Sequence, residues 1–295
     1  MARSLLLLAL ALAACDAPFR VELPEHDSRL VVSSLFAADS VITLTVGRSL
    51  SVLDPDAPSS DNVTTATVSL FEDGTPVGEA TYVPNRLRYI SSVRARAGRT
   101  YRVRVEAAGF DPVEAEDTVP LPRPFEVAVV PGPTPTGGRP RVDAVTVRFA
   151  DPSGEDFYAL YGLSERRGAD GAINQLFGLA FSSTDPLLTD GDLTGLVTDF
   201  DDPYYRQAFF RDRAFDGESV ALQIDVLRVD SEAGAGFTER LRLAAVSETY
   251  YGYVRARDTG GVSTPFDTPR ALPSNVVGGY GIFAAFAASE QVLPE

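Results

Sequence analysis

The stretch TTATVSLFEDGTPVGEATY, residues 64–82, decides the fold class of the first half of the chain. Two runs rich in Thr, Val and other strand-favouring residues stand on either side of Asp73-Gly74. An Asp-Gly pair between two such runs predicts a tight β-hairpin, because both residues tolerate the positive φ angles that the favoured hairpin turns require. The stretch therefore predicts two adjacent antiparallel strands.

The segments on either side of this hairpin carry further strand patterns. Residues 41–46 (VITLTV) are rich in β-branched side chains, which favour strands. Residues 100–106 alternate between apolar and polar, which is typical of a half-buried strand. Short strands with turns about every ten residues predict an immunoglobulin-like β-sandwich, which we place at residues 29–120. The apolar face of the alternating strand consists of Tyr101, Val103 and Val105.

A proline-rich joint separates this unit from a second one. Pro120, Pro122 and Pro124 follow the last strand pattern, and proline cannot donate the backbone hydrogen bond that a central strand needs. Residues 121–288 then predict a larger β domain with one or two short helices, followed by a tail at 289–295. The strand candidates of this domain are Phe125–Val130, Val142–Phe149, Phe157–Leu163, Ser219–Val229 and Glu239–Val246.

Two segments of the second unit differ from its strands. Residues 185–217 are rich in Asp, and we expect a long loop there with one helical turn near Pro203–Arg211. From Ser247 to residue 258 two patterns compete. Ser247 before Glu248 favours the start of a helix, whereas Gly252 and the tyrosines around it favour a strand.

The first fifteen residues have the pattern of an export signal. Arg3 precedes the apolar run Leu5–Ala14, which as a helix would span about 15 Å, roughly half of a bilayer core. The run ends in Leu12-Ala13-Ala14-Cys15, which resembles the signal at which bacterial lipoproteins are cleaved and lipidated. Cys15 is the only cysteine, so it cannot form an internal disulfide.

We therefore expect residues 1–14 to be a lipoprotein signal peptide, Cys15 to be the lipidation site, and residues 15–28 to form a lipidated tether. Two or three acyl chains would hold the protein firmly at a membrane surface, because each buried CH₂ contributes about 0.8 kcal/mol. We expect no cofactor besides this covalent lipid. The alternative is a plain secretory signal with a spare cysteine.

Several phrases in the second half of the chain resemble domain-of-unknown-function family 4249, a family of envelope lipoproteins from Bacteroidota-type bacteria. The resemblance implies an outer-membrane lipoprotein, and members are associated with receptors that import large nutrients. It implies no catalytic residues, and it favours the helix after Ser247. The phrases are Asp151-Pro-Ser-Gly-Glu-Asp-Phe-Tyr158, Arg213-Ala-Phe-Asp-Gly217, Ser247-Glu-Thr-Tyr-Tyr-Gly-Tyr253 and Pro273-Ser-Asn-Val-Val-Gly-Gly-Tyr-Gly-Ile-Phe283.

The last of these phrases also has a physical interpretation. The three glycines within residues 278–281 permit a close approach of backbone that a Cβ would prevent. We expect Tyr280, Ile282 and Phe283 to fill core positions beside them. A phosphate-binding loop is the alternative, but such a loop usually needs a basic residue, and the nearest upstream arginine is Arg270.

The composition excludes several classes of function. The 295 residues carry a formal net charge of −15, whereas a nucleic-acid binder should present a basic surface. The one histidine, His26, lies in the predicted tether and Cys15 is the predicted lipid site, so we expect neither a Ser-His-Asp triad nor a zinc site. A pair of carboxylates that hydrolyses glycosides stays open, although none of the 41 acidic residues stands out as such a pair.

Calcium is the best metal candidate, because it prefers several oxygen ligands from carboxylates and carbonyls. The acidic loop offers such ligands at short spacing, although it does not reproduce an EF-hand. The alternative is a solvated acidic loop in an acidic protein. The candidate ligands are Asp190, Asp192, Asp199, Asp201 and Asp202.

Arginines gather between residues 86 and 104, and the chain contains no lysine. The functional interpretation is an anion-binding patch for lipid phosphate or an acidic partner. The alternative is a solvent-exposed face whose arginines pair with neighbouring acids. The patch candidates are Arg86, Arg88, Arg102 and Arg104.

Taken together, these patterns predict a lipid-anchored protein of the cell envelope, on a face of the outer membrane that the sequence leaves open. Its expected role is that of a non-enzymatic binding or accessory module for an outer-membrane β-barrel receptor or importer. The first alternative is a structural or adhesive surface lipoprotein. The second is a hydrolase that uses a pair of carboxylates.

Overall fold

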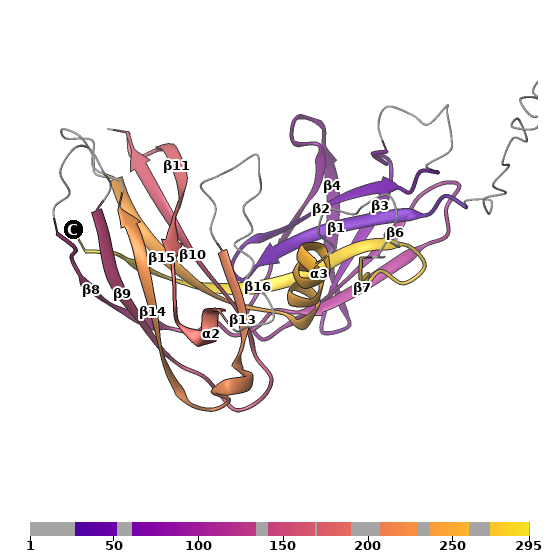
Figure 1. Ribbon diagram of the computed structural model, residues 1–295. Coiled ribbons are helices and arrows are strands. Elements are labelled where there is room, and N and C mark those ends of the chain that lie inside the picture. Colours follow the sequence, from indigo (N-terminus) through magenta and orange to yellow (C-terminus); the bar gives the residue numbers. More distant parts are fainter. Residues whose placement is uncertain are drawn as a thin grey trace, which may run out of the picture.

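The strands predicted from alternation and β-branched runs are present in a computed structural model of the chain, and they form two β domains (Figure 1). This confirms the predicted mainly-β class. The structure describes residues 27–51, 61–133, 141–168, 170–189, 207–228, 237–259 and 272–294. The predicted signal peptide and most of the predicted tether lie outside these residues.

The N-terminal domain is an immunoglobulin-like sandwich in which the strands follow the order β1-β2-β5-β4-β3-β6-β7. The β3–β4 hairpin turns at Asp73 and Gly74, whose φ angles of 47° and 80° are those expected of the Asp-Gly turn. The strands are β1 (Leu30–Ala37), β2 (Val41–Arg48), β3 (Thr67–Glu72), β4 (Thr75–Val83), β5 (Arg88–Arg94), β6 (Thr100–Glu106) and β7 (Val113–Thr118).

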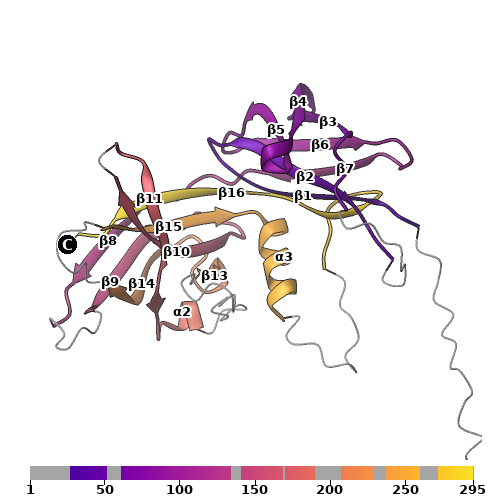
Figure 2. The ribbon, with the colours of Figure 1, turned by 90° about the horizontal axis from the view of Figure 1, so that it is seen from above.

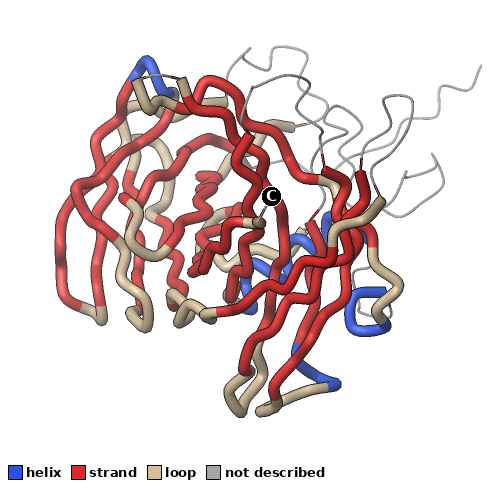
Figure 3. Tube along the Cα trace, turned by 90° about the vertical axis from the view of Figure 1, so that its left-hand side faces the viewer, coloured by secondary structure: helices blue, strands red, loops and turns tan. Residues whose placement is uncertain are grey.

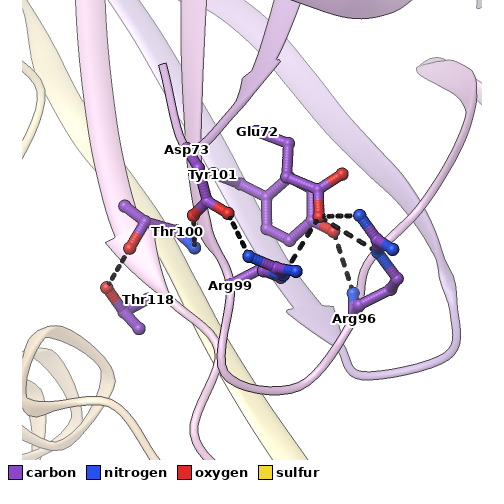
Figure 4. Close-up of polar contacts among 7 residues, drawn as sticks. All are labelled: Glu72, Asp73, Arg96, Arg99, Thr100, Tyr101 and Thr118. Atoms are coloured by element: carbon purple, nitrogen blue, oxygen red, sulfur yellow. Dashed lines mark hydrogen bonds and ion pairs between the residues drawn. The ribbon is translucent and has the colours of Figure 1, made fainter. Parts of the chain in front are cut away.

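The apolar face predicted for β6 packs into the core of this domain, since Tyr101, Val103 and Val105 are all buried. The hydroxyl of Tyr101 accepts a hydrogen bond from the amide of Arg96 at 2.9 Å (Figure 4). A buried tyrosine at the start of this strand that bonds to upstream backbone is a recurrent feature of immunoglobulin-like sandwiches. A short 3₁₀ turn, η1 (Pro84–Arg86), connects β4 and β5.

The strands of the N-terminal domain continue into the C-terminal domain as one 12-stranded sheet, whose far end is formed by β15, β10 and β11. The C-terminal domain packs a second, four-stranded sheet, β12-β14-β9-β8, against this end, where β13 and β11 follow one another along β10. Figure 3 views this domain from the end that carries the C-terminus. The elements are β8 (Phe125–Val130), β9 (Arg141–Ala150), β10 (Phe157–Arg167), β11 (Ile173–Leu179), β12 (Phe181–Ser182), α2 (Pro186–Thr189), β13 (Gln207–Arg211), η2 (Asp212–Ala214), β14 (Ser219–Arg228) and β15 (Phe237–Val246).

Two assignments that the sequence left difficult are resolved. Residues 207–211 form strand β13 rather than part of a helical turn, because Phe209 and Phe210 are both buried, on opposite faces of the sheet. The segment after Ser247 is helix α3 (Glu248–Thr259), as the resemblance favours. The Ser247 hydroxyl caps this helix by accepting a hydrogen bond from the amide of Tyr250 at 3.2 Å.

The last strand, β16 (Tyr280–Val292), belongs to both domains (Figure 2). Its first half pairs parallel with β1, and its second half pairs antiparallel with β15. The predicted boundary at residue 288 therefore falls inside a strand, and residues 289–292 are not a tail. Local sequence patterns could not show this, because the pairing joins opposite ends of the chain. Helix α3 lies on the face of β16 away from the N-terminal domain.

The glycines at the start of β16 have the predicted role of allowing close contact. A Cβ at Gly281 would lie 1.9 Å from the carbonyl oxygen of Val32 in the neighbouring strand. Ile282 and Phe283 are buried as expected, whereas Tyr280 is 42% exposed and does not fill a core position. Tyr280 is the first residue of β16, so its side chain lies at the edge of the core.

Candidate functional site

Two of the quoted phrases meet at one end of the C-terminal sandwich. The turn between β9 and β10 carries Asp151, and the turn between β13 and β14 carries Asp212 and Asp216. Carboxylate oxygens of these three residues all lie within 4.8 Å of one another, and we call this group the acidic cluster. Asp151 and Asp212 are buried, whereas Asp216 is exposed.

The acidic cluster forms because each turn offers its carboxylates to the backbone of the other. The amide of Gly217 donates to Asp151 at 2.9 Å, which crosses from the second turn to the first. In the opposite direction, the amide of Asp156 donates to Asp212 at 2.8 Å and that of Gly154 donates to Asp216 at 2.9 Å. The three carboxylates thus bind the two turns together.

Within this group, the pKa of Asp212 is shifted. Burial raises the pKa of Asp212, and the negative charges of Asp151, Asp156 and Asp216 raise it further. The buried hydroxyl of Tyr158 donates a hydrogen bond to Asp151, and its pKa is raised by burial and by that bond. The ring of Tyr158 packs among Phe149, Phe210 and Phe215.

The acidic cluster offers the carboxylate oxygens that calcium prefers as ligands. Its observed contacts are hydrogen bonds that join the two turns. Arg123 also approaches Asp156, with 3.3 Å between Nη2 and Oδ1, and offsets part of the negative charge. The sequence placed Asp212 and Asp216 in the acidic stretch but gave no signal that Asp151 joins them. All five predicted calcium ligands, Asp190, Asp192, Asp199, Asp201 and Asp202, lie outside the described residues.

The other two phrases meet at the junction of the domains. The side chain of Asn275 donates to the carbonyl of Phe283 at 2.8 Å and accepts from its amide at 3.0 Å, so it binds the first part of β16 as a neighbouring strand would. The same amide nitrogen donates to the carbonyl of Glu116 in β7 at 3.0 Å. Asp117, whose pKa is raised by burial, accepts the amide of Ala285 at 2.7 Å. Asn275 and Asp117 therefore fix β16 to the N-terminal domain.

A shallow hollow of about 250 Å³ lies beside this junction. It lies between the first turn of α3 and the segment that carries Asn275, and its lining residues are Glu248, Thr249, Gly252, Pro273, Ser274 and Asn275. Residues of the third and fourth phrases line this hollow together, so the two phrases are neighbours in the fold. Its polar lining includes the hydroxyl of Thr249, which lies 3.4 Å from Asp117.

The arginines of the predicted anion patch lie in two separate places. Arg86 and Arg88 belong to η1 and β5, whereas Arg102 and Arg104 lie on β6, with β4 and β3 between. Glu114 accepts hydrogen bonds from Arg102 at 2.9 Å and Arg104 at 2.8 Å, and both arginines lower its pKa, Arg104 more strongly. Half of the candidate patch is therefore paired with an acid.

A similar pairing extends along the β3–β4 hairpin. Glu72 pairs with Arg96, and Asp73 accepts a hydrogen bond from Arg99 at 2.8 Å and from the amide of Thr100 at 3.1 Å (Figure 4). The arginines of these ion pairs are at least half exposed, so each pair contributes little to stability. They hold the hairpin turn against the loop that follows β5.

Neither the predicted lipid site nor the predicted signal belongs to the described part of the chain, so Cys15 stays a prediction. Within the described ranges, every helix is too short or too polar to cross a membrane.

Comparison with known proteins identifies a family that matches nearly the whole chain. A family model described as "Domain of unknown function (DUF4249)" matches residues 16–292. A comparison with curated proteins finds no match. A solved structure named as a membrane-anchored protein from Corynebacterium diphtheriae is similar at 10% identity and a TM-score of 0.21. The similarity covers 76% of this chain and 55% of that one, so this chain spans little more than half of its length.

Proposed function

The chain belongs to the DUF4249 family, and on that premise we propose that it is a lipid-anchored protein of the cell envelope that serves an outer-membrane receptor or importer as a non-enzymatic binding module. The proposal combines the lipoprotein-like signal that ends at Cys15 with the architecture of the described residues. The observation that carries it is the strand shared by the two domains.

Strand β16 supports a binding role because it makes the two domains one continuous sheet. Its first half pairs with β1, close to the point where the predicted tether enters, and its second half pairs with β15 in the far domain. Domains joined only by a linker would move independently. Here, the pairing of β16 with both β1 and β15 holds a surface on the C-terminal domain in a fixed orientation relative to the N-terminal domain, which the tether precedes.

The C-terminal domain also has an exposed apolar surface. Val142 of β9 lies directly opposite Leu227 of β14, and the two are 45% and 38% exposed. Val130 at the end of β8 is 67% exposed, and its partner in the ladder is Ala144. These four residues lie on the outer face of the four-stranded sheet, because the alternate residues face the core. Exposed apolar patches often mark interaction sites.

Purification of the tagged full chain from detergent-solubilised native membranes tests the proposal. We expect a large β-barrel protein to be recovered with the wild-type chain, and about tenfold less of it with Leu227→Asp, since a charge placed in an apolar contact is costly. Leu35→Asp is the matched control, because Leu35 is 45% exposed on β1 in the other domain. It should retain the partner.

Two results would overturn the proposal. Repeated recovery of the wild-type chain alone would favour the structural or adhesive role, which needs no transporter partner. Recovery of the Cys15→Ala chain in the membrane fraction at the wild-type level would show that a lipid on Cys15 does not hold the protein at the membrane, since that variant has no thiol to modify.

A further inference from the structure

The end of the N-terminal domain where the described chain begins is held firmly. The hydroxyl of Ser28 donates to the carbonyl of Ser49 at 2.7 Å, and the amide of Ser49 donates to the carbonyl of Arg29 at 2.8 Å. These bonds fix Arg29 to the end of β2, immediately before β1 begins at Leu30. The chain that leads back to Cys15 therefore leaves the domain at a defined position.

Exposed apolar residues lie on the segments next to this position, since Tyr280 contacts Arg29, Leu50 follows Ser49, and Val277 precedes Gly278 at the hollow that Arg29 lines. Val277 is 74% exposed, Tyr280 is 42% exposed and Leu50 is 39% exposed. We call these three residues, together with Arg29, the tether rim. The exposure of Val277 does not reflect a loose backbone, because its amide and carbonyl both bond to Glu114 of β7, at 2.7 and 3.2 Å.

The tether rim and the hollow beside it carry charges of both signs. The guanidinium of Arg29 lies 5.7 Å from the centre of the Tyr280 ring, where a cation and an aromatic face attract each other. Beside it is a hollow of about 410 Å³, whose lining includes Arg29 together with Asp27 and Asp111. A surface of mixed charge on a chain with a net charge of −15 suits a zwitterionic surface better than an anionic one.

We propose that the tether rim rests on the zwitterionic lipid surface in which the anchor at Cys15 is embedded. This inference depends on the lipid anchor of the proposed function. Residues 16–26 separate Cys15 from the described chain, so the tether reaches at most about 40 Å. Tyrosine is enriched where membrane meets water, and a rim of Tyr, Val and Leu with one Arg has the composition of an interfacial contact.

A single tryptophan makes this contact measurable, because the chain contains none. The lipidated full chain with Val277→Trp is reconstituted into phosphatidylcholine vesicles that contain a brominated acyl chain as quencher. We expect a blue-shifted emission that the brominated lipid reduces about twofold or more, as for a residue at the headgroup boundary. The matched control is Val130→Trp, since Val130 is similarly exposed at 67%. Strand β8, which ends at Val130, lies at the opposite end of the molecule from β1 and should give no quenching (Figure 1).

Each result separates the rim from the anchor. Flotation of the protein with vesicles reports the anchor, and tryptophan quenching reports the rim. Flotation without quenching of Val277→Trp, or with equal quenching of Val130→Trp, would overturn the rim and leave the anchor standing. Failure to float would overturn the anchor, and the rim with it. If Val277→Trp does not show the circular dichroism of the wild type, Tyr280→Trp replaces it under the same criteria.

Discussion

The two domains differ in where they place their charges. In the N-terminal domain the buried polar side chains among the described residues are two serines, Ser34 and Ser91, and the ion pairs lie at the surface. The described residues of the C-terminal domain bury five carboxyl side chains and one arginine, namely Asp143, Asp151, Glu165, Asp212, Glu239 and Arg228. Two sandwiches of similar architecture thus follow different electrostatic strategies.

This difference indicates that the stability of the C-terminal domain depends more strongly on its charged side chains. An exposed ion pair is solvated whether or not it forms, whereas a buried charge is stable only with a partner. Arg228 shows the second case. Its Nε pairs with Glu239, its Nη1 lies 3.5 Å from Oδ2 of Asp143, and its Nη2 donates to the carbonyl of Pro294 at 2.9 Å.

The largest effect is expected for Arg228→Met, which keeps the length of the side chain but leaves Asp143 and Glu239 without this cation. A broken buried pair typically costs about 3–5 kcal/mol, and we expect a loss near the lower end of this range because Asp143 keeps its pair with Arg141 at 2.8 Å. Urea unfolding followed by circular dichroism measures the loss. The control is Arg148→Met on the exposed face of β9, which should unfold at nearly the wild-type concentration. An Arg228→Met protein as stable as this control would mean that the C-terminal domain does not depend on its buried charges more than the N-terminal domain depends on its exposed ones.

A smaller effect is expected for Tyr158→Phe, which removes only the hydroxyl that donates to Asp151. The buried carboxylate keeps the amide of Gly217 and loses its other donor, so the free energy of unfolding should fall by about 1–3 kcal/mol. Thermal unfolding at neutral pH measures this change. Tyr280→Phe, at an exposed tyrosine, should leave the midpoint unchanged. Equal midpoints for both variants would mean that the acidic cluster does not need the hydroxyl.

The pH dependence of stability should also separate the domains. The pKa of Asp212 is raised, so its stabilising contribution is complete below its unfolded pKa and is lost as pH rises through the folded pKa. The pKa of Glu114 in the N-terminal domain is lowered, so its contribution is present above its unfolded pKa and is lost as pH falls through the folded pKa. Asp151, Asp156 and Asp216 are the charges that raise the pKa of Asp212, and Arg123 pairs with Asp156.

Asp212→Asn isolates the first of these effects, because Asn stays neutral and its oxygen still accepts the amide of Asp156. We expect this variant to gain stability relative to the wild type, by about 1 kcal/mol, as pH rises from acidic to neutral. Denaturant unfolding at a series of pH values measures the difference. A constant difference across that range would show that Asp212 has an ordinary pKa.

Sequence patterns were sufficient for several elements that depend on neighbours in the chain. The alternation of Tyr101, Val103 and Val105 and the Asp73-Gly74 turn predict their elements correctly, because strand and turn preferences act over a few residues. Strand β13 was missed because the adjacent Phe209 and Phe210 are buried on opposite faces, which hides the usual alternation.

Features that join distant segments could not be predicted in this way. The acidic cluster unites Asp151 with residues of another turn, and β16 returns to pair with β1. Both follow from the topology, which no local pattern contains. Asp151, Asp216 and the start of β16 did appear in the family-like phrases, but Asp212 and β1 did not, and the phrases gave no sign of which residues meet.

The smallest effect is expected for Arg102→Gln, and it tests the other side of the comparison. Arg102 bonds to Glu114 and lies 4.0 Å above the ring of Phe71, but its side chain is 28% exposed and Glu114 keeps Arg104 as a second partner. We expect the free energy of unfolding to fall by about 1 kcal/mol or less. Because salt screens exposed pairs, the difference from wild type should shrink further in about 1 M NaCl. A loss as large as that of Arg228→Met, unaffected by salt, would mean that the surface arginines stabilise the N-terminal domain as strongly as buried ones stabilise its neighbour. The placement of charge would then no longer distinguish the two domains.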